Sequence, residues 1–140
     1  MLTLSERPLH VLVVDGDEAV ADRIRMALTG EDPSTVHTCL AVGTVAEGLE
    51  CVAHGGVDLI LLELDLPDSE GIVTFERMHA FAPEVPILVY GRDTDEETAL
   101  LAVRGGAQDF LDADELEGFP LRRAIRYALE RHRLMSALRS

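Results

Sequence analysis

Three short, nearly continuous runs of apolar residues constrain the fold of this chain most strongly. They cover 9–14, 59–62 and 87–90, and a polar or glycine-containing turn follows each run. Continuous rather than alternating apolarity is typical of strands that are covered on both faces, as in the centre of a parallel sheet. Two weaker strand candidates cover 35–40 and 108–111. The pattern therefore predicts one sheet with helices on both faces.

The segments between these strands have the spacing of helices. Apolar residues recur at intervals of three and four after Asp17, and capping-box patterns begin at Thr44 and Thr94. A further helix is predicted over 71–82, and a last one from near Pro120 to the end of the chain. Strands that alternate with helices in this way predict a doubly wound α/β fold with right-handed crossovers.

Charge and cysteine content exclude several classes of function. The 140 residues include 26 acidic and 12 basic ones, which gives a formal net charge of −14, and all the basic residues are arginine. Such an acidic surface repels phosphate backbones and anionic lipid, so we expect neither a nucleic-acid nor a membrane partner for this domain. We find no signal peptide, and the two cysteines, Cys39 and Cys51, are expected to be buried free thiols. We expect a cytoplasmic protein.

Acidic residues follow the predicted strands at the edge where sheets of this kind bind ligands. Asp15 and Asp17 come after the first strand, and Glu63 and Asp65 come after the third. Because the first and third strands are neighbours in the expected topology, Asp15 and Glu63 should lie close together. Carboxylates that converge repel one another unless a cation or hydrogen bonds offset their charge. The sequence thus predicts an acidic pocket at this edge.

The motifs at the strand ends resemble those of response-regulator receiver domains, the CheY-like domains of two-component signalling. They read VLVVDGDE, DLILLELDLPDSEG, PILVYGRD and AVRGGAQDFL. The resemblance implies a flavodoxin-like, doubly wound, five-stranded parallel sheet of order 2-1-3-4-5 with an extended C-terminal helix. It places a receiver domain at 9–128, between an N-terminal tail at 1–8 and a C-terminal helical extension at 129–140 that would link to an output module.

The resemblance also assigns roles to the acidic residues. In that family an acidic pair after the first strand holds Mg²⁺, and an aspartate at the end of the third strand accepts a phosphoryl group from a histidine kinase. Here Asp15 matches the first acid, Gly16 replaces the second, and Asp17 is displaced by one position. Glu63 occupies the phosphoacceptor position, two residues before Asp65. Metal ligation would fall to Asp15, Glu63 and Asp65, and we expect it to be weak or absent.

The switch positions differ as well. The family has a threonine or serine after the fourth strand and a lysine after the fifth, and both contact the phosphoryl group. Here Gly91 replaces the hydroxyl residue and Ala113 replaces the lysine, whereas Phe110 keeps an aromatic position. Glu63 either imitates the charge of a phosphorylated acceptor or marks a site that is no longer used for this chemistry. The missing lysine and hydroxyl favour the second interpretation.

These substitutions predict a degenerate receiver, or pseudo-receiver, that is not an enzyme and has no cofactor. It would act independently of phosphorylation, through contacts with a histidine kinase or an output domain. It would also form a homodimer through the fourth helix (94–105), the fifth strand (108–111) and the fifth helix. The alternative is a phosphoacceptor that uses Mg²⁺ with Asp65 or Glu63. A flavin or small-molecule site in the same pocket is a third candidate, which the acidic, aromatic-poor lining disfavours.

Overall fold

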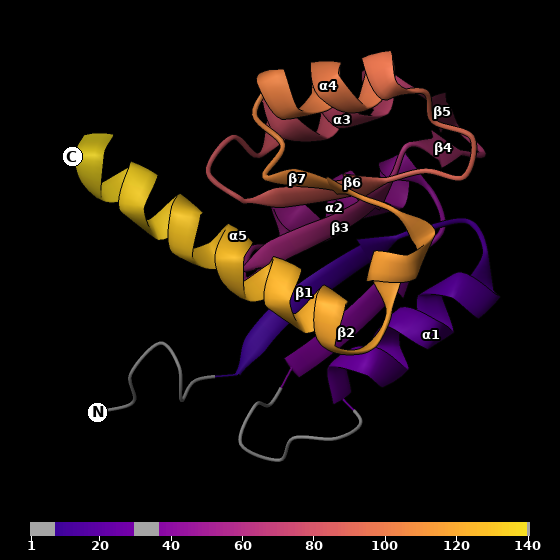
Figure 1. Cartoon of the computed structure of the whole chain (residues 1–140), viewed down its shortest axis with the longest axis horizontal. Coiled ribbons are helices and arrows are strands. Elements are labelled where there is room, and N and C mark those ends of the chain that lie inside the picture. Colours follow the sequence, from indigo (N-terminus) through magenta and orange to yellow (C-terminus); the bar gives the residue numbers. More distant parts are fainter. Residues whose placement is uncertain (1–7, 30–36, 140) are drawn as a thin grey trace.

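The computed structural model describes residues 8–29 and 37–139 (Figure 1). Within these residues, one parallel sheet has the strand order β2-β1-β3-β6-β7. Its strands are β1 (Leu9–Val14), β2 (His37–Val42), β3 (Leu59–Glu63), β6 (Ile87–Tyr90) and β7 (Asp109–Leu111). Between β3 and β6, the sequence patterns missed a small antiparallel pair, β4 (Asp65–Leu66) and β5 (Ser69–Glu70). Numbered without that pair, the sheet has the predicted order 2-1-3-4-5, so the expected flavodoxin-like fold is confirmed.

Helices cover both faces of the sheet, as the apolar strands require. The helices are α1 (Glu18–Thr29), α2 (Val45–Ala53), α3 (Ile72–Phe81), α4 (Glu96–Arg104) and α5 (Gly118–Arg139), with a 3₁₀ helix, η1 (Ala113–Leu116), before α5. One face of the sheet packs against α1 and α5, and the other packs against α2, α3 and α4 (Figure 1). The central strands β1, β3 and β6 are thus largely buried between two helical layers, whereas the edge strand β2 is partly exposed.

The core alternates between the two layers along each strand. In β3, Leu59 and Leu61 contact the α1 and α5 layer, whereas Ile60 and Leu62 contact the opposite layer. All four side chains have 0% exposure. The side chains of β1 and β6 alternate between the two layers in the same way. The residues at the ends of these strands lie at the carboxyl edge of the sheet.

Two of the predicted helix boundaries can be checked by their caps. Thr44 caps α2 as expected, because its side-chain oxygen accepts a hydrogen bond from the Glu47 amide at 3.1 Å. The predicted cap at Thr94 is wrong. Asp95 is the N-cap of α4 and accepts a hydrogen bond from the Thr98 amide at 2.7 Å. An aspartate one residue later performs the same capping function, and Thr94 remains in the loop before the helix.

The C-terminal helix is the longest element in the described part of the chain. Its last buried residue is Ala128, and the exposed apolar side chains of Leu134, Met135 and Leu138 follow. Figure 1 shows this end of α5 reaching beyond the sheet. The proposed boundary between domain and extension at 128/129 stays a prediction, as does the tail at 1–8, of which 1–7 lie outside the described residues.

Cys39 and Cys51 are free thiols as expected, but each is only partly buried. Among the described residues, none of the helices has the length and apolar character that crossing a bilayer would require.

Candidate functional site

The carboxyl ends of β1, β3 and β6 meet at an open cleft of about 900 Å³. Carboxylates dominate its lining: Asp15, Asp17, Glu18, Glu63, Asp65, Glu70 and Asp93. Among the described residues that line the cleft, Arg92 carries the one permanent positive charge. The predicted acidic pocket is therefore present, and the topology brings its members together from segments far apart in the sequence.

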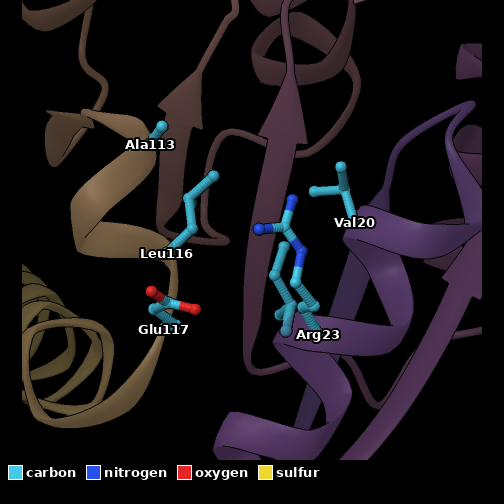
Figure 2. Close-up of a pocket in the computed structure, with 6 residues that line it drawn as sticks. Val20, Arg23, Ala113, Leu116 and Glu117 are labelled. Carbon is cyan, nitrogen blue, oxygen red and sulfur yellow. The ribbon is translucent and has the colours of Figure 1, made fainter.

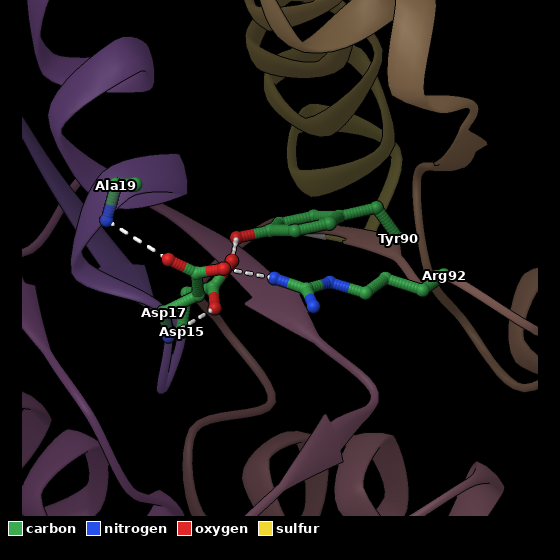
Figure 3. A network of polar contacts seen from close by, with 5 residues as sticks. All are labelled: Asp15, Asp17, Ala19, Tyr90 and Arg92. Atoms are coloured by element: carbon green, nitrogen blue, oxygen red, sulfur yellow. Dashed lines mark hydrogen bonds and ion pairs between the residues drawn. The ribbon is translucent and has the colours of Figure 1, made fainter.

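Asp15 lies at the end of β1 and has both carboxylate oxygens engaged. Its Oδ1 accepts a hydrogen bond from the Asp17 amide at 2.8 Å, and its Oδ2 accepts one from the Tyr90 hydroxyl at 2.8 Å (Figure 3). Asp15 is only 6% exposed and Tyr90 only 2%. The charge of this buried carboxylate is thus stabilised by hydrogen bonds from the chain itself.

Glu63 ends β3 and lies next to Asp15. The strand register pairs Val14 with Leu62 across β1 and β3, and pairs Glu63 with Tyr90 across β3 and β6. The Glu63 side chain is 4% exposed, and its Oε1 accepts a hydrogen bond from the Asp65 amide at 3.0 Å. Burial, together with the negative charges of Asp15 and Asp65, raises the pKa of Glu63 to about 7. A substantial fraction of this carboxyl is therefore protonated at neutral pH.

Asp17 caps the first helix and forms an ion pair across the cleft. Its Oδ1 accepts a hydrogen bond from the Ala19 amide at 2.9 Å, and its Oδ2 contacts the guanidinium of Arg92 (Figure 3). The hydrogen bond from Arg92 lowers the pKa of Asp17, and the same contact raises the pKa of Arg92. Asp17 thus lies in the cleft as predicted, with a partner that the sequence patterns did not identify.

Gly91 leaves room for a hydroxyl group from the following loop. A Cβ atom at Gly91 would lie 2.0 Å from Thr94 Oγ1 and 3.5 Å from Glu63 Oε1. The Thr94 side chain therefore occupies the volume that a residue larger than glycine would need at position 91. Gly91 was predicted at a switch position and Thr94 as a helix cap, but the sequence patterns predicted no role in the site for Tyr90, Arg92 or Thr94. The available signal was their placement at the end of a buried strand that pairs with Glu63, or within four residues after it.

The other two switch positions lie outside the residues that line the acidic cleft. Phe110, on β7, is partly buried against the α2, α3 and α4 layer. Ala113 begins η1 and is exposed. With Arg23 and Glu117, it borders a hollow of about 10 Å³ between α1 and η1, which Figure 2 shows. Neither residue supplies a charged group to the carboxylates.

The described residues do not fit a bound Mg²⁺ ion. Mg²⁺ demands near-octahedral coordination by oxygen. No group of three or more histidine, cysteine, aspartate or glutamate side chains in the described part of the chain is arranged to hold a metal. Asp15 has hydrogen bonds at both oxygens, Asp17 is paired with Arg92, and Gly16 offers no side chain. Asp15 and Asp17 therefore have their hydrogen-bond and ion-pair partners within the protein.

Comparisons with known proteins agree on one family. Residues 11–115 match the family described as the response regulator receiver domain. The KDP operon transcriptional regulatory protein KdpE of Escherichia coli is 30% identical over 128 residues, which cover 91% of this chain and 54% of KdpE. The chain thus spans about half the length of the curated relatives it matches first.

Solved structures show the same fold. A response regulator receiver domain protein from Clostridium thermocellum has a TM-score of 0.78 at 20% identity, covering 91% of this chain and 98% of that one. A CheY-like receiver domain protein from Methanospirillum hungatei has a TM-score of 0.77 at 22% identity, covering 92% and 99%. These likenesses extend over nearly all of the described sheet and its two helical layers.

Proposed function

The chain belongs to the response regulator receiver domain family, and from this premise we propose that it is a receiver that signals through protein contacts without phosphoryl transfer to residue 63. The observation that carries the proposal is the state of Glu63. Its carboxyl is 4% exposed, accepts a hydrogen bond from the Asp65 amide, and has a pKa of about 7. A carboxyl in this state is poorly suited to attack a phosphorus atom.

The chemistry of an acyl phosphate explains why. The attacking carboxylate must be ionised and aligned with the leaving group, and a displacement of about 1 Å can cost roughly 100-fold in rate. Glu63 is one methylene longer than the aspartate of the family. The transferred group would also need cations around it, because its oxygens gain negative charge. The position of the family's lysine, two residues after β7, holds Ala113, which is exposed and supplies no charge.

We propose that the partner is a protein, either a histidine kinase or an output domain, and that the domain is not an enzyme. A homodimer through α4, β7 and α5 is a further part of this proposal. Its support is the exposed apolar side chains on two of these elements, which include Leu100, Leu101 and Val103 on α4 and Tyr127 on α5. Apolar groups left in water favour association with another protein surface.

One observation favours the second candidate, a phosphoacceptor that uses Glu63 or Asp65. Arg92 brings a guanidinium into the cleft, and Thr94 brings a hydroxyl next to Glu63. These two groups are of the kinds that contact a phosphoryl group, although they come from one loop. This candidate still requires a metal site that the carboxylates, as arranged, do not form.

Acetyl phosphate with Mg²⁺, followed by intact-mass measurement, tests the two candidates. We expect the wild-type chain and a Glu63→Gln variant each to keep its own unmodified mass, with no added phosphoryl group. Glu63→Asp is the matched variant, because it restores the family's acceptor in the same surroundings. Stoichiometric addition of a phosphoryl group to the wild type would overturn the proposal, and peptide mapping would then show whether Glu63 or Asp65 carries it.

A further inference from the structure

The acidic cleft concentrates negative charge at one point of the fold. Seven carboxylates line it, and Arg92 is its one permanently charged cationic side chain among the described residues. Like charges that converge in a partly buried site raise the energy of the folded state unless an opposite charge lies nearby. The chain must therefore balance the charge of this cleft with an ion from solution or with a group of its own.

We propose that Arg92 is the built-in counter-cation of the cleft, and that its guanidinium takes the charge-balancing place of a bound divalent ion. This inference deepens the proposed function, on which it rests, because a guanidinium at this place would oppose the binding of a metal ion. The ion pair also joins the loop between β6 and α4 to the loop between β1 and α1.

The guanidinium of Arg92 lies close enough to Asp17, Asp15 and Glu63 to interact with their charges. Arg92 pairs with Asp17, and Figure 3 shows its side chain running beside the Tyr90 ring toward Asp15 and Asp17. The charges of Asp17, Asp15 and Glu63 all raise the pKa of Arg92. Because a guanidinium stays charged at every pH of interest, its effect on these carboxylates is permanent.

Two side-chain contacts join the loop after β1 to the end of β6 and the loop that follows it. Arg92 to Asp17 is the exposed link, and Tyr90 to Asp15 at 2.8 Å is the buried one. The partners in each link are 75 positions apart in the sequence. The hydroxyl thus satisfies the inner carboxylate and the guanidinium satisfies the outer one.

Gly91 is what lets the loop follow this path. A Cβ atom there would lie 2.0 Å from Thr94 Oγ1, so a larger residue would force the Thr94 side chain, in the loop that carries Arg92, to move. The glycine is therefore part of the same device as the arginine.

Metal binding is a better measure of this role than stability. The Arg92 and Asp17 side chains are 64% and 39% exposed, and exposed ion pairs contribute little to folding. A positive charge a few ångströms from a divalent ion, in contrast, strongly opposes its binding. Removing that charge should allow the carboxylates to take up an ion.

The experiment measures Mg²⁺ and Mn²⁺ affinity by calorimetry at fixed, low ionic strength. We expect Arg92→Gln to bind about tenfold more tightly than the wild type or more, from the loss of one charge near the ion. Arg104→Gln is the matched control, because it removes the same charge from the exposed end of α4, outside the cleft lining. Gly91→Ser, which forces the Thr94 side chain to move in the loop that carries Arg92, should also increase affinity.

Equal affinity for the wild type, Arg92→Gln and Gly91→Ser would overturn the inference, as would an equal gain in Arg104→Gln. Amide hydrogen exchange of residues 91–95 gives a second readout, since these amides should exchange faster in Arg92→Gln than in Arg104→Gln, and equal rates would also count against it. The phosphorylation assay is independent of both. Modification of the wild type would overturn the proposed function, and unchanged metal affinity would overturn only the role of Arg92.

Discussion

Glu63 should make the stability of this domain fall as pH rises through neutrality. Its carboxyl is buried, and burial beside Asp15 and Asp65 raises its pKa from an ordinary value of 4.5 to about 7. The folded state therefore holds this proton more tightly than the unfolded chain does. The resulting stabilisation is fully present below about pH 4.5 and is lost as pH rises through about 7.

The size of the effect follows from the two pKa values. Each unit of difference corresponds to about 1.4 kcal/mol, and the unfolded carboxyl is already largely ionised at pH 5. Between pH 5 and pH 8, ionisation of Glu63 should remove about 2.5 kcal/mol of unfolding free energy. Glu63→Gln keeps the shape of the side chain and an oxygen for the Asp65 amide, and it removes the ionisation.

Urea unfolding of both proteins at pH 5, 6, 7 and 8, at constant ionic strength, isolates this contribution. All other titrating groups are shared, so the difference between the two proteins reports on Glu63 alone. We expect Glu63→Gln to gain about 2.5 kcal/mol relative to the wild type across this range. Parallel stability curves would show that the carboxyl ionises as freely in the folded state as in the unfolded chain, and the reasoning would fail.

Three further substitutions test contacts around the cleft and the core by urea unfolding at pH 7. Tyr90→Phe should cost about 1.5 to 3 kcal/mol, since it leaves a buried oxygen of Asp15 without its 2.8 Å donor, and unchanged stability would show that water replaces the hydroxyl. Asp68→Ala should cost about 1 kcal/mol, because its carboxylate accepts hydrogen bonds from the first two amides of α2, and a neutral result would contradict this cap. Leu62→Ala, at a position with 0% exposure, should cost about 2 to 5 kcal/mol, and a cost below 1 kcal/mol would mean that the core collapses around the cavity.

The sheet could be predicted because each of its central strands is indicated by a short run of neighbouring residues. The segments 9–14, 59–62 and 87–90 are apolar on both faces, and a strand with two apolar faces requires a covered parallel sheet. The meeting of Asp15 and Glu63 then follows from the strand order, since both residues come directly after the apolar part of neighbouring strands. Periodicity and topology are sufficient for these statements, and no side-chain contact has to be known.

The partners of the carboxylates were not predictable in the same way. Each depends on where a side chain points from the end of β6 or the loop after it, 75 positions away. Tyr90 belongs to the apolar run of its strand, and only the structure shows that its hydroxyl reaches Asp15. The misplaced cap has a similar cause. Thr94 and Glu97 have the spacing of a capping box, but Asp95 is also a residue type that caps helices, and in the structure its side chain accepts the hydrogen bond from Thr98.

The same loop shows why an altered position in a motif cannot be read as a loss by itself. Glycine at 91 removes a hydroxyl from the strand end, and by removing it admits the hydroxyl of Thr94 to nearly the same place. The turn that results also carries the guanidinium of Arg92 to Asp17. One substitution thus changes which residues surround Glu63, while a hydroxyl and a positive charge both remain close to it. If this exchange is what keeps the cleft free of metal, then Gly91 and Arg92 should depend on each other, and the gains in Mg²⁺ affinity from the two single variants should not add in the double variant.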